Sequence, residues 1–404
     1  MERTGFTAST DGQRPSKPVP KDRSPGFTEL FLSFLWLGTT AFGGPAMVAY
    51  IRDLSVKRKK WLDQDTFKRG VALCQTIPGA TAIQVAAYIG LQARGVPGAL
   101  CTFIGFGLPA FVLMVVLSYL YVSAANLAWV RALFSGLQLA VVALVANATY
   151  TFGKEAVRNY SDIIIAGASA ALFWFGISPF YVILGSVLAG LLLGRQSEYG
   201  DPQNEAHLVI PFFHVIALIV VAIGGITSLY LFRPDLLLLA LVMIKVDLFA
   251  FGGGFASVPL MLQEIVNVRG WMTSNVFMDG IALGQITPGP IVITSTFVGY
   301  LLYGLPGAVI ATVAIFTPSF LLVVTVAGFF EKLNRSASFR KALKGIFASF
   351  VGLLLYVTVK FAFAVPWSAI RVLIVCAALA ALLKKIDILY VVLAVACLGV
   401  LLFR

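Results

Sequence analysis

The sequence predicts an all-α polytopic membrane protein whose two homologous halves are inverted-topology repeats with broken or re-entrant helices. Three observations lead to this fold class: an apolar composition, a pair of glycine- and proline-rich motifs that occurs twice, and a reversed distribution of basic residues between the two copies. Of the 404 residues, 59% are hydrophobic and 12% are charged. Soluble domains contain about 25% charged residues, so this composition indicates a membrane protein.

The apolar residues form runs of helical length. Stretches of about 20 apolar residues, enough to cross a bilayer as helix, recur along most of the chain. The alternating pattern of a membrane β-barrel is absent. Residues 1–26 are polar and lack the apolar core of a secretory signal, so we expect a disordered cytoplasmic tail.

The chain contains an internal duplication. A shift of about 209 residues aligns FGGPAMV at 42–48 with FGGGFAS at 251–257, and GVALCQTIPGA at 70–80 with GIALGQITPGP at 280–290. We therefore expect a first transporter repeat at 27–194 and a second at 233–404. The linker at 195–232 carries one extra apolar segment, and a single added span would turn the second repeat upside down.

Lysine and arginine residues test this inversion. The loop at 52–69 carries seven of them, whereas its counterpart at 268–279 carries only Arg269. The bias is opposite further along, because 121–131 has one basic residue and 331–344 has five. Basic loops face the cytoplasm. The pattern favours inverted repeats, with the broken segments as re-entrant hairpins and the N-terminus inside; fully spanning segments would place the seven-charge loop outside.

The glycine and proline motifs break the helices at membrane depth, where irregular backbone must be buried in protein or line a cavity. Proline suits the first position of a helix, so Pro45, Pro78 and Pro288 are each expected to begin a second half-helix. Helix N-termini carry free amides and partial positive charge, which bind anions. The candidate substrate-binding residues are Gly43, Gly44, Pro45, Gln75, Pro78, Gly79, Thr81, Gln84, Lys245, Gly252, Gly253, Gly254, Gln285, Thr287, Pro288, Gly289, Pro290 and Thr294.

Charged groups support an anionic substrate. We expect almost no carboxylates inside the membrane, whereas cation transporters usually need them. Lys245 is placed near the midplane and is assigned to substrate attraction; Asp247 is assigned to gating or tuning. Their i, i+2 spacing puts them on different helix faces, so no direct ion pair is expected. For any single glycine, close helix packing is the alternative interpretation.

The motifs FGGP and QxxPG in one half, with FGGG and GQxTPGP in the other, resemble the chromate ion transporter family in its long, two-domain form. The similarity covers residues 27–404. It implies efflux of chromate across the bacterial inner membrane and chromate resistance, with sulfate as a competing or exchanged analogue. A basic residue at the position of Lys245 is typical of the family, whereas Asp247 stands where glycine is expected.

The leading interpretation is a secondary active transporter that exports chromate, with a transporter or channel for another divalent oxyanion such as sulfate as the alternative. The expected partners are chromate or sulfate and membrane lipids, with no nucleic acid; a homodimer is left open. No P-loop motif, cofactor motif, metal-ligand cluster or paired cysteines occur, so neither an enzyme nor a cofactor is expected.

Overall fold

The computed structural model describes residues 25–42, 46–124, 126–193 and 212–403, and within them it contains helices joined by short turns and no strands. The first half comprises α1 (Phe27–Thr40), α2 (Ala46–Arg52), the π-helical turn η2 (Asp53–Arg58), α3 (Gln64–Thr76), α4 (Thr81–Ala124), α5 (Ala128–Ala156), α6 (Tyr160–Trp174) and α7 (Pro179–Leu193). The separate helix α8 (Phe212–Phe232) follows. Nearly all of the expected tail lies outside the described residues.

The second half repeats this order. It comprises α9 (Pro234–Phe249), η3 (Gly254–Ala256), α10 (Ser257–Met261), η4 (Leu262–Val268), α11 (Ser274–Ile286), η5 (Ile291–Ile293), α12 (Thr294–Val326), α13 (Phe330–Arg335), α14 (Ala337–Ala364), α15 (Ala369–Leu383) and α16 (Ile388–Leu402). Five helical segments among the described residues are long and apolar enough to cross a membrane. The two repeated halves and the multi-pass helical membrane fold are thus confirmed.

Each half places its chain breaks at the tips of helical hairpins. After the break at 77–80 the chain reverses direction. The evidence is that α3 and α4 lie side by side: a Cβ added to Gly70 of α3 would lie 2.2 Å from the Tyr88 ring of α4. The second half repeats the contact, with Gly280 of α11 against the Phe297 ring at 2.5 Å. At 13 residues, α3 and α11 are each about 20 Å long, which is too short to cross a hydrocarbon layer of about 30 Å.

A second reversal follows within α4. Arg94 and Gly95 leave the helical conformation, and Gly95 has a φ of +65°. A Cβ added to Gly90 would lie 2.2 Å from the carbonyl oxygen of Gly98, a contact that a straight helix cannot make. The same turn occurs in α12 at Tyr303 and Gly304. Hence α3, the first part of α4 and the long remainder of α4 are three consecutive antiparallel rods.

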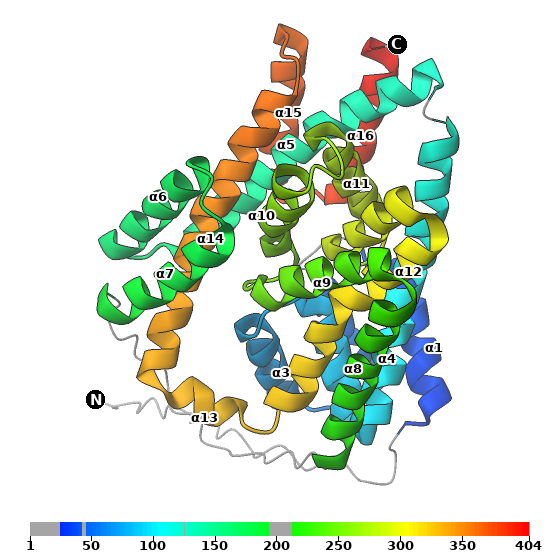
Figure 1. Cartoon of the computed structure of the whole chain (residues 1–404), viewed down its shortest axis with the longest axis vertical. Coiled ribbons are helices and arrows are strands. Elements are labelled where there is room, and N and C mark those ends of the chain that lie inside the picture. Colours follow the sequence, from blue (N-terminus) through cyan, green and yellow to red (C-terminus); the bar gives the residue numbers. More distant parts are fainter. Residues whose placement is uncertain (1–24, 43–45, 125, 194–211, 404) are drawn as a thin grey trace, which may run out of the picture.

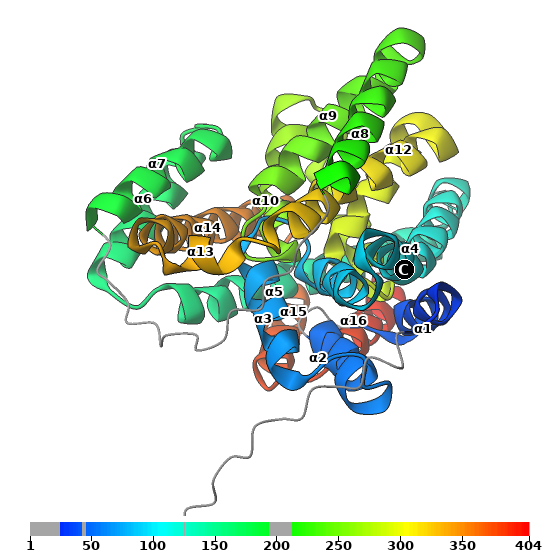
Figure 2. The same ribbon diagram turned by 90° about the horizontal axis from the view of Figure 1, so that it is seen from below.

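The two halves exchange their last helices. The hairpin of α6 and α7 packs on α14 of the second half, and α15 and α16 pack on α5 of the first (Figure 1). Figure 2 shows α6 and α7 on the opposite side of the molecule from α1 and α4. Equivalent glycines make both contacts: a Cβ on Gly136 would lie 2.7 Å from the Val395 carbonyl oxygen, and one on Gly345 would lie 2.1 Å from that of Ser186.

One hydrogen bond marks where the halves meet symmetrically. The hydroxyls of Thr149 in α5 and Thr358 in α14 lie 3.0 Å apart, and these residues are 209 positions apart in sequence. That separation is the offset of the duplication, so each threonine contacts its own repeat equivalent. The halves therefore meet there through equivalent positions.

The exchanged packing predicts an unequal cost for two glycine substitutions. Gly345→Ala is expected to destabilise the protein by about 1–3 kcal/mol, because the new methyl group meets backbone that cannot move aside. Gly185→Ala on α7 is the matched control, since its Cβ would meet nothing within 4 Å. Thermal unfolding of both variants in detergent measures the difference, and equal stability would contradict the described packing.

Candidate functional site

The tips of the broken hairpins from both halves meet inside the protein. The amide of Gly79 donates a hydrogen bond of 2.9 Å to the carbonyl oxygen of Ala250, at the end of α9. A Cβ on Gly253 would lie 3.3 Å from the Thr81 hydroxyl, and one on Gly254 would lie 2.9 Å from the Ile291 side chain. We call residues 77–81, 250–254 and 287–291 the tip site.

Glycine is required at the turns of the tip site. Gly79 and Gly289 have φ values of +118° and +127°, and Gly252 and Gly253 have +92° and +97°. Side chains strain such backbone. At Gly79 a side chain would also collide with Ser319, whose hydroxyl would be 2.0 Å from the new Cβ. These glycines therefore serve backbone conformation and close approach, beyond ordinary helix packing.

The breaks leave backbone donors unpaired. Among the described residues, the amides of Thr81, Ala82 and Ile83 at the start of α4 have no hydrogen-bond acceptor, and neither do those of Gly289 and Ile291. The expectation that Pro78 and Pro288 begin helices is wrong: α4 begins at Thr81, and η5 begins at Ile291. Both prolines lie in the preceding extended turn, where positive-φ glycines follow them. Unpaired amides at such a turn can donate hydrogen bonds to an anion.

A buried polar cluster adjoins the tip site. One carboxylate oxygen of Asp247 (Oδ2) accepts hydrogen bonds of 2.8 Å from both the amide and the hydroxyl of Ser319 in α12. The Ser319 hydroxyl accepts in turn from the Ala80 amide at 3.3 Å, and the Gln84 side-chain amide lies 3.5 Å from it. Gln84 also donates to the carbonyl oxygen of Pro78 at 2.6 Å. The cluster joins α9 and α12 to the break of the first half.

Lys245 is held by a carboxylate that the sequence did not single out. Its ammonium lies 2.8 Å from Glu264 in η4 and 3.8 Å from the centre of the Phe180 ring. Glu264 is buried and also binds Arg269. The absence of an ion pair between Lys245 and Asp247 among the described residues agrees with their spacing. Lys245, Glu264 and Arg269 together carry one net positive charge.

The expected scarcity of carboxylates inside the protein is wrong. Asp162, Asp247, Glu264 and Asp279 are all at least nine-tenths buried. Asp162 caps α6 by accepting from the amides of Arg158 and Asn159. These four carboxylates lie within apolar or mixed segments of the sequence, where their burial is hard to predict. Because carboxylates are not scarce, the case for an anionic substrate rests on the unpaired amides and on Lys245.

The other candidate residues divide by position. Gln75 is exposed and Gln285 is half-buried. The buried hydroxyls of Thr287 and Thr294 donate to carbonyl oxygens of their own hairpin, those of Gly284 and Ile291. Pro290 is buried at the start of η5. Gly43, Gly44 and Pro45 lie outside the described residues.

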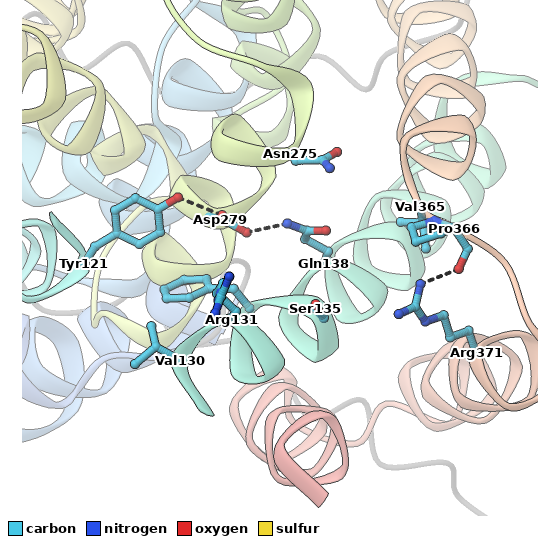
Figure 3. Close-up of a pocket in the computed structure, with 11 residues that line it drawn as sticks. Tyr121, Val130, Arg131, Ser135, Gln138, Asn275, Asp279, Val365, Pro366 and Arg371 are labelled. Atoms are coloured by element: carbon cyan, nitrogen blue, oxygen red, sulfur yellow. Dashed lines mark hydrogen bonds between the residues drawn. The ribbon is translucent and has the colours of Figure 1, made fainter. Parts of the chain in front are cut away.

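A cavity of about 320 Å³ opens beside the start of α5 (Figure 3). Its buried wall holds Asp279, which accepts from the Tyr121 hydroxyl at 2.9 Å and the Gln138 amide at 2.8 Å. Arg131 and Arg371 line the same cavity. Arg131 forms no ion pair within the described ranges, so the cavity offers a free cation.

Sequence reasoning missed Ser319, Glu264 and Asp279. Ser319 lies in TPSF, the repeat counterpart of the apolar LPAF at 108–111, and this polar change was a usable signal. Glu264 and Asp279 lie near the ends of the tip hairpins, where a charged residue is ordinarily taken for a loop residue. Their partners come from other elements, so the sequence alone does not pair them.

The fold and the tip site define a helical membrane protein whose duplicated halves bring broken helices together in its core. The chain belongs to the chromate transporter family: the family model matches residues 28–191 and 237–400, once in each half. It is similar to a chromate transport protein of Cupriavidus metallidurans, with 31% identity over 80% of both chains, and to one of Pseudomonas aeruginosa, with 30% identity over 98% of both.

An uncharacterized transporter of Methanocaldococcus jannaschii is also similar, with 42% identity over 94% of this chain and 96% of the relative. No solved structure matches the chain. The comparisons confirm the predicted family and a function in chromate transport.

The buried position of Glu264 predicts the effect of neutralising it. Glu264→Gln is expected to destabilise the protein by about 1–3 kcal/mol, because Lys245 and Arg269 then lose their shared carboxylate. Glu29→Gln is the control, since the Lys59–Glu29 pair has a similar separation of 2.9 Å but is exposed. The comparison is made by thermal unfolding in detergent, and a control loss as large as the Glu264 loss would refute the assignment.

Proposed function

We propose that this protein is a secondary active transporter that exports chromate from the cytoplasm, in exchange for sulfate, and so confers chromate resistance. The observation that carries the proposal is the meeting of unpaired backbone amides at the tip site, contributed by both halves. Chromate and sulfate are tetrahedral dianions, and amide donors suit either. The names of the relatives favour chromate as the substrate.

Electrostatics at the site favour a dianion. Each half-helix that starts at the tip site directs about half a positive charge toward it. Lys245, with Glu264 and Arg269, adds one net positive charge on the α9 hairpin. In a low-dielectric interior the helix ends act strongly because little water screens them, whereas the Lys245 side chain is 44% exposed and its charge is screened more. We assign Lys245 to substrate attraction on this basis.

Contacts within the first half support a cytoplasmic N-terminus. Lys59 pairs with Glu29 at 2.9 Å, and the Arg94 guanidinium donates to the carbonyl oxygen of Pro25 at 2.8 Å. The start of α1, the basic loop at 52–69 and the turn at Arg94 therefore share one end of the molecule. By the positive-inside rule this end is cytoplasmic. In this proposal the tip hairpins are re-entrant and the halves are inverted in the inner membrane.

Alternating access follows from the same arrangement. The tip hairpins contribute the substrate contacts, whereas α5 and α14 with their exchanged partners form the interlocked remainder. A movement of one set against the other opens the tip site to each side in turn. One-for-one exchange of two dianions moves no net charge, whereas a dianion that leaves a negative-inside cell alone gains about 2.3 kcal/mol per charge per 100 mV, so the membrane potential favours export without a returning anion. Arg131 and Arg371 place positive charge at the opposite, external mouth.

Transport by inverted membrane vesicles tests the proposal. Vesicles that contain the protein are expected to take up chromate saturably, and internal sulfate is expected to stimulate the uptake. Lys245→Met should lower the initial rate at least tenfold, because the site loses its fixed cation. Lys57→Met is the control, since Lys57 is exposed and pairs only with the partly exposed Asp53.

The outcomes separate the alternatives. Uptake that does not saturate and is insensitive to internal sulfate would identify a channel. Saturable sulfate uptake without chromate uptake would assign another oxyanion as substrate. Uptake equal to that of empty vesicles, with the protein folded, would refute transport of either dianion.

A further inference from the structure

We propose that Asp247 takes up and releases one proton in each transport cycle, so that the oxyanion moves together with a proton. The inference rests on the proposed function for the identity of the anion, but the proton site itself stands on geometry. The reaction is simple: the carboxylate gains a proton to become a neutral carboxyl group, and loses it again when the site opens to the other side.

The surroundings of Asp247 call for a neutral form. Its side chain is 0% exposed, and no lysine, arginine or histidine among the described residues pairs with it. An isolated carboxylate without a counter-ion is very costly to bury, and such groups neutralise instead. One oxygen accepts two donors from Ser319, whereas the other (Oδ1) has no partner. The geometry therefore places the proton on Oδ1.

The neighbouring amide has the complementary deficiency. The side-chain oxygen of Gln84 is buried and likewise has no donor, although its nitrogen bonds to Pro78 and lies beside Ser319. The cluster thus holds two buried acceptors without a donor. Protonation of Asp247 adds a donor to this cluster, and buried polar groups are normally satisfied in this way.

The ionisable groups on the elements that pack around Asp247 do not supply a cation. On α9 itself, Lys245 is bound to Glu264, and Asp235 is bound to Arg233. Of the other helices that pack on α9, α10 carries no ionisable side chain, and α8 and α12 carry His214, Tyr230, Tyr300 and Tyr303. The hairpin of α3 and α4, which brings Ala80 and Gln84 to the cluster, carries Asp65, Lys68, Arg69, Cys74, Tyr88, Arg94, Cys101, Tyr119 and Tyr121. In the described part of the chain none of these side chains bonds to Asp247, because its Oδ2 accepts from Ser319 and its Oδ1 has no partner.

The cluster exists in only one of the two repeats. The residue equivalent to Asp247 is Gly38, and the residue equivalent to Ser319 is Ala110. Gly38 has no space for a side chain, because a Cβ there would lie 2.5 Å from the Phe106 carbonyl oxygen. Gly289, the counterpart of Gly79, faces the methyl group of Ala110 instead of a hydroxyl. The duplication therefore did not dictate this carboxylate, which breaks the symmetry at the contact between the halves.

The position of the cluster couples the proton to the anion. Asp247 reaches the tip site through Ser319 and the Ala80 amide. A dianion at the tip site and an ionised Asp247 have the same sign and repel each other, so anion binding favours the protonated carboxyl. By reciprocity, protonation favours anion binding to the same degree. Proton and anion accordingly travel in the same direction.

Liposomes that contain the purified protein and a pH-sensitive dye test this coupling. Chromate is added outside liposomes that contain no sulfate, so that no exported dianion carries a proton back, and both chromate entry and luminal pH are followed. Entry through the wild-type protein is expected to acidify the lumen relative to Asp247→Asn at equal chromate uptake. Chromate's own protonation is identical in all vesicles, so the difference reports protons carried by the protein. The variant should lower the ratio of protons to chromate at least tenfold.

Asp162→Asn is the matched control, because Asp162 is also buried but, within the described residues, accepts only capping hydrogen bonds, which asparagine can still accept. Its proton-to-chromate ratio should equal that of the wild type. Asp247→Gly, which restores the residue of the other repeat, is a second variant if Asp247→Asn does not fold. An unchanged ratio in either Asp247 variant, or wild-type alkalinisation relative to it, overturns the proposal.

Infrared spectroscopy provides a readout that does not depend on transport. Near neutral pH the wild-type protein should show a carbonyl band from protonated, buried carboxyl groups, and the Asp247 variants should lose the part of this band that one carboxyl group contributes. If the band is present but no chromate is carried, the proposed function fails while the proton site stands. If the variants leave the spectrum unchanged, the proton site is wrong whatever the transport assay shows.

Discussion

The structure depends on one constraint: backbone groups that are freed by a broken helix cannot face lipid. Each half breaks its helices at the tips of hairpins, and the tips are enclosed by the other half, as the bond between Gly79 and Ala250 shows. The glycines with positive φ let the chain turn within this enclosure. In our proposal, donors that could not be satisfied in lipid thereby become available to bind an anion.

The duplication sets the architecture, and departures from it set the chemistry. Equivalent glycines, kinks and hairpins recur in both halves, from the turn at Gly95 and Gly304 to the contact between Thr149 and Thr358. The charged and polar clusters do not recur: Lys245 corresponds to Trp36, and Glu264 to Ser55. In our proposal, a symmetric scaffold gives two comparable states for alternating access, and the unmatched groups attract the substrate and carry the proton.

Much of this arrangement could be predicted from the sequence, because repeated motifs and helix-breaking residues are local signals. The hairpin tips and the extra helix α8 both follow from such signals. The partners of the charged residues do not: Ser319 is 72 positions from Asp247, and Tyr121 is 158 from Asp279. Predicted helix starts at Pro78 and Pro288 were displaced because both prolines occupy the extended turn. Neither repeat carries a sequence signal that α6 and α7 pack on α14 of the other half, or that α15 and α16 pack on α5.

That exchange has a consequence for biosynthesis. The helix α5 is synthesised early, yet its partners α15 and α16 are the last helices to leave the ribosome. Until then Gly136 of α5 lacks its close backbone contact with Gly399 of α16. During synthesis the first half therefore stays in the membrane without the packing partner of α5. A chain that ends before residue 388 lacks α16 and cannot form this contact.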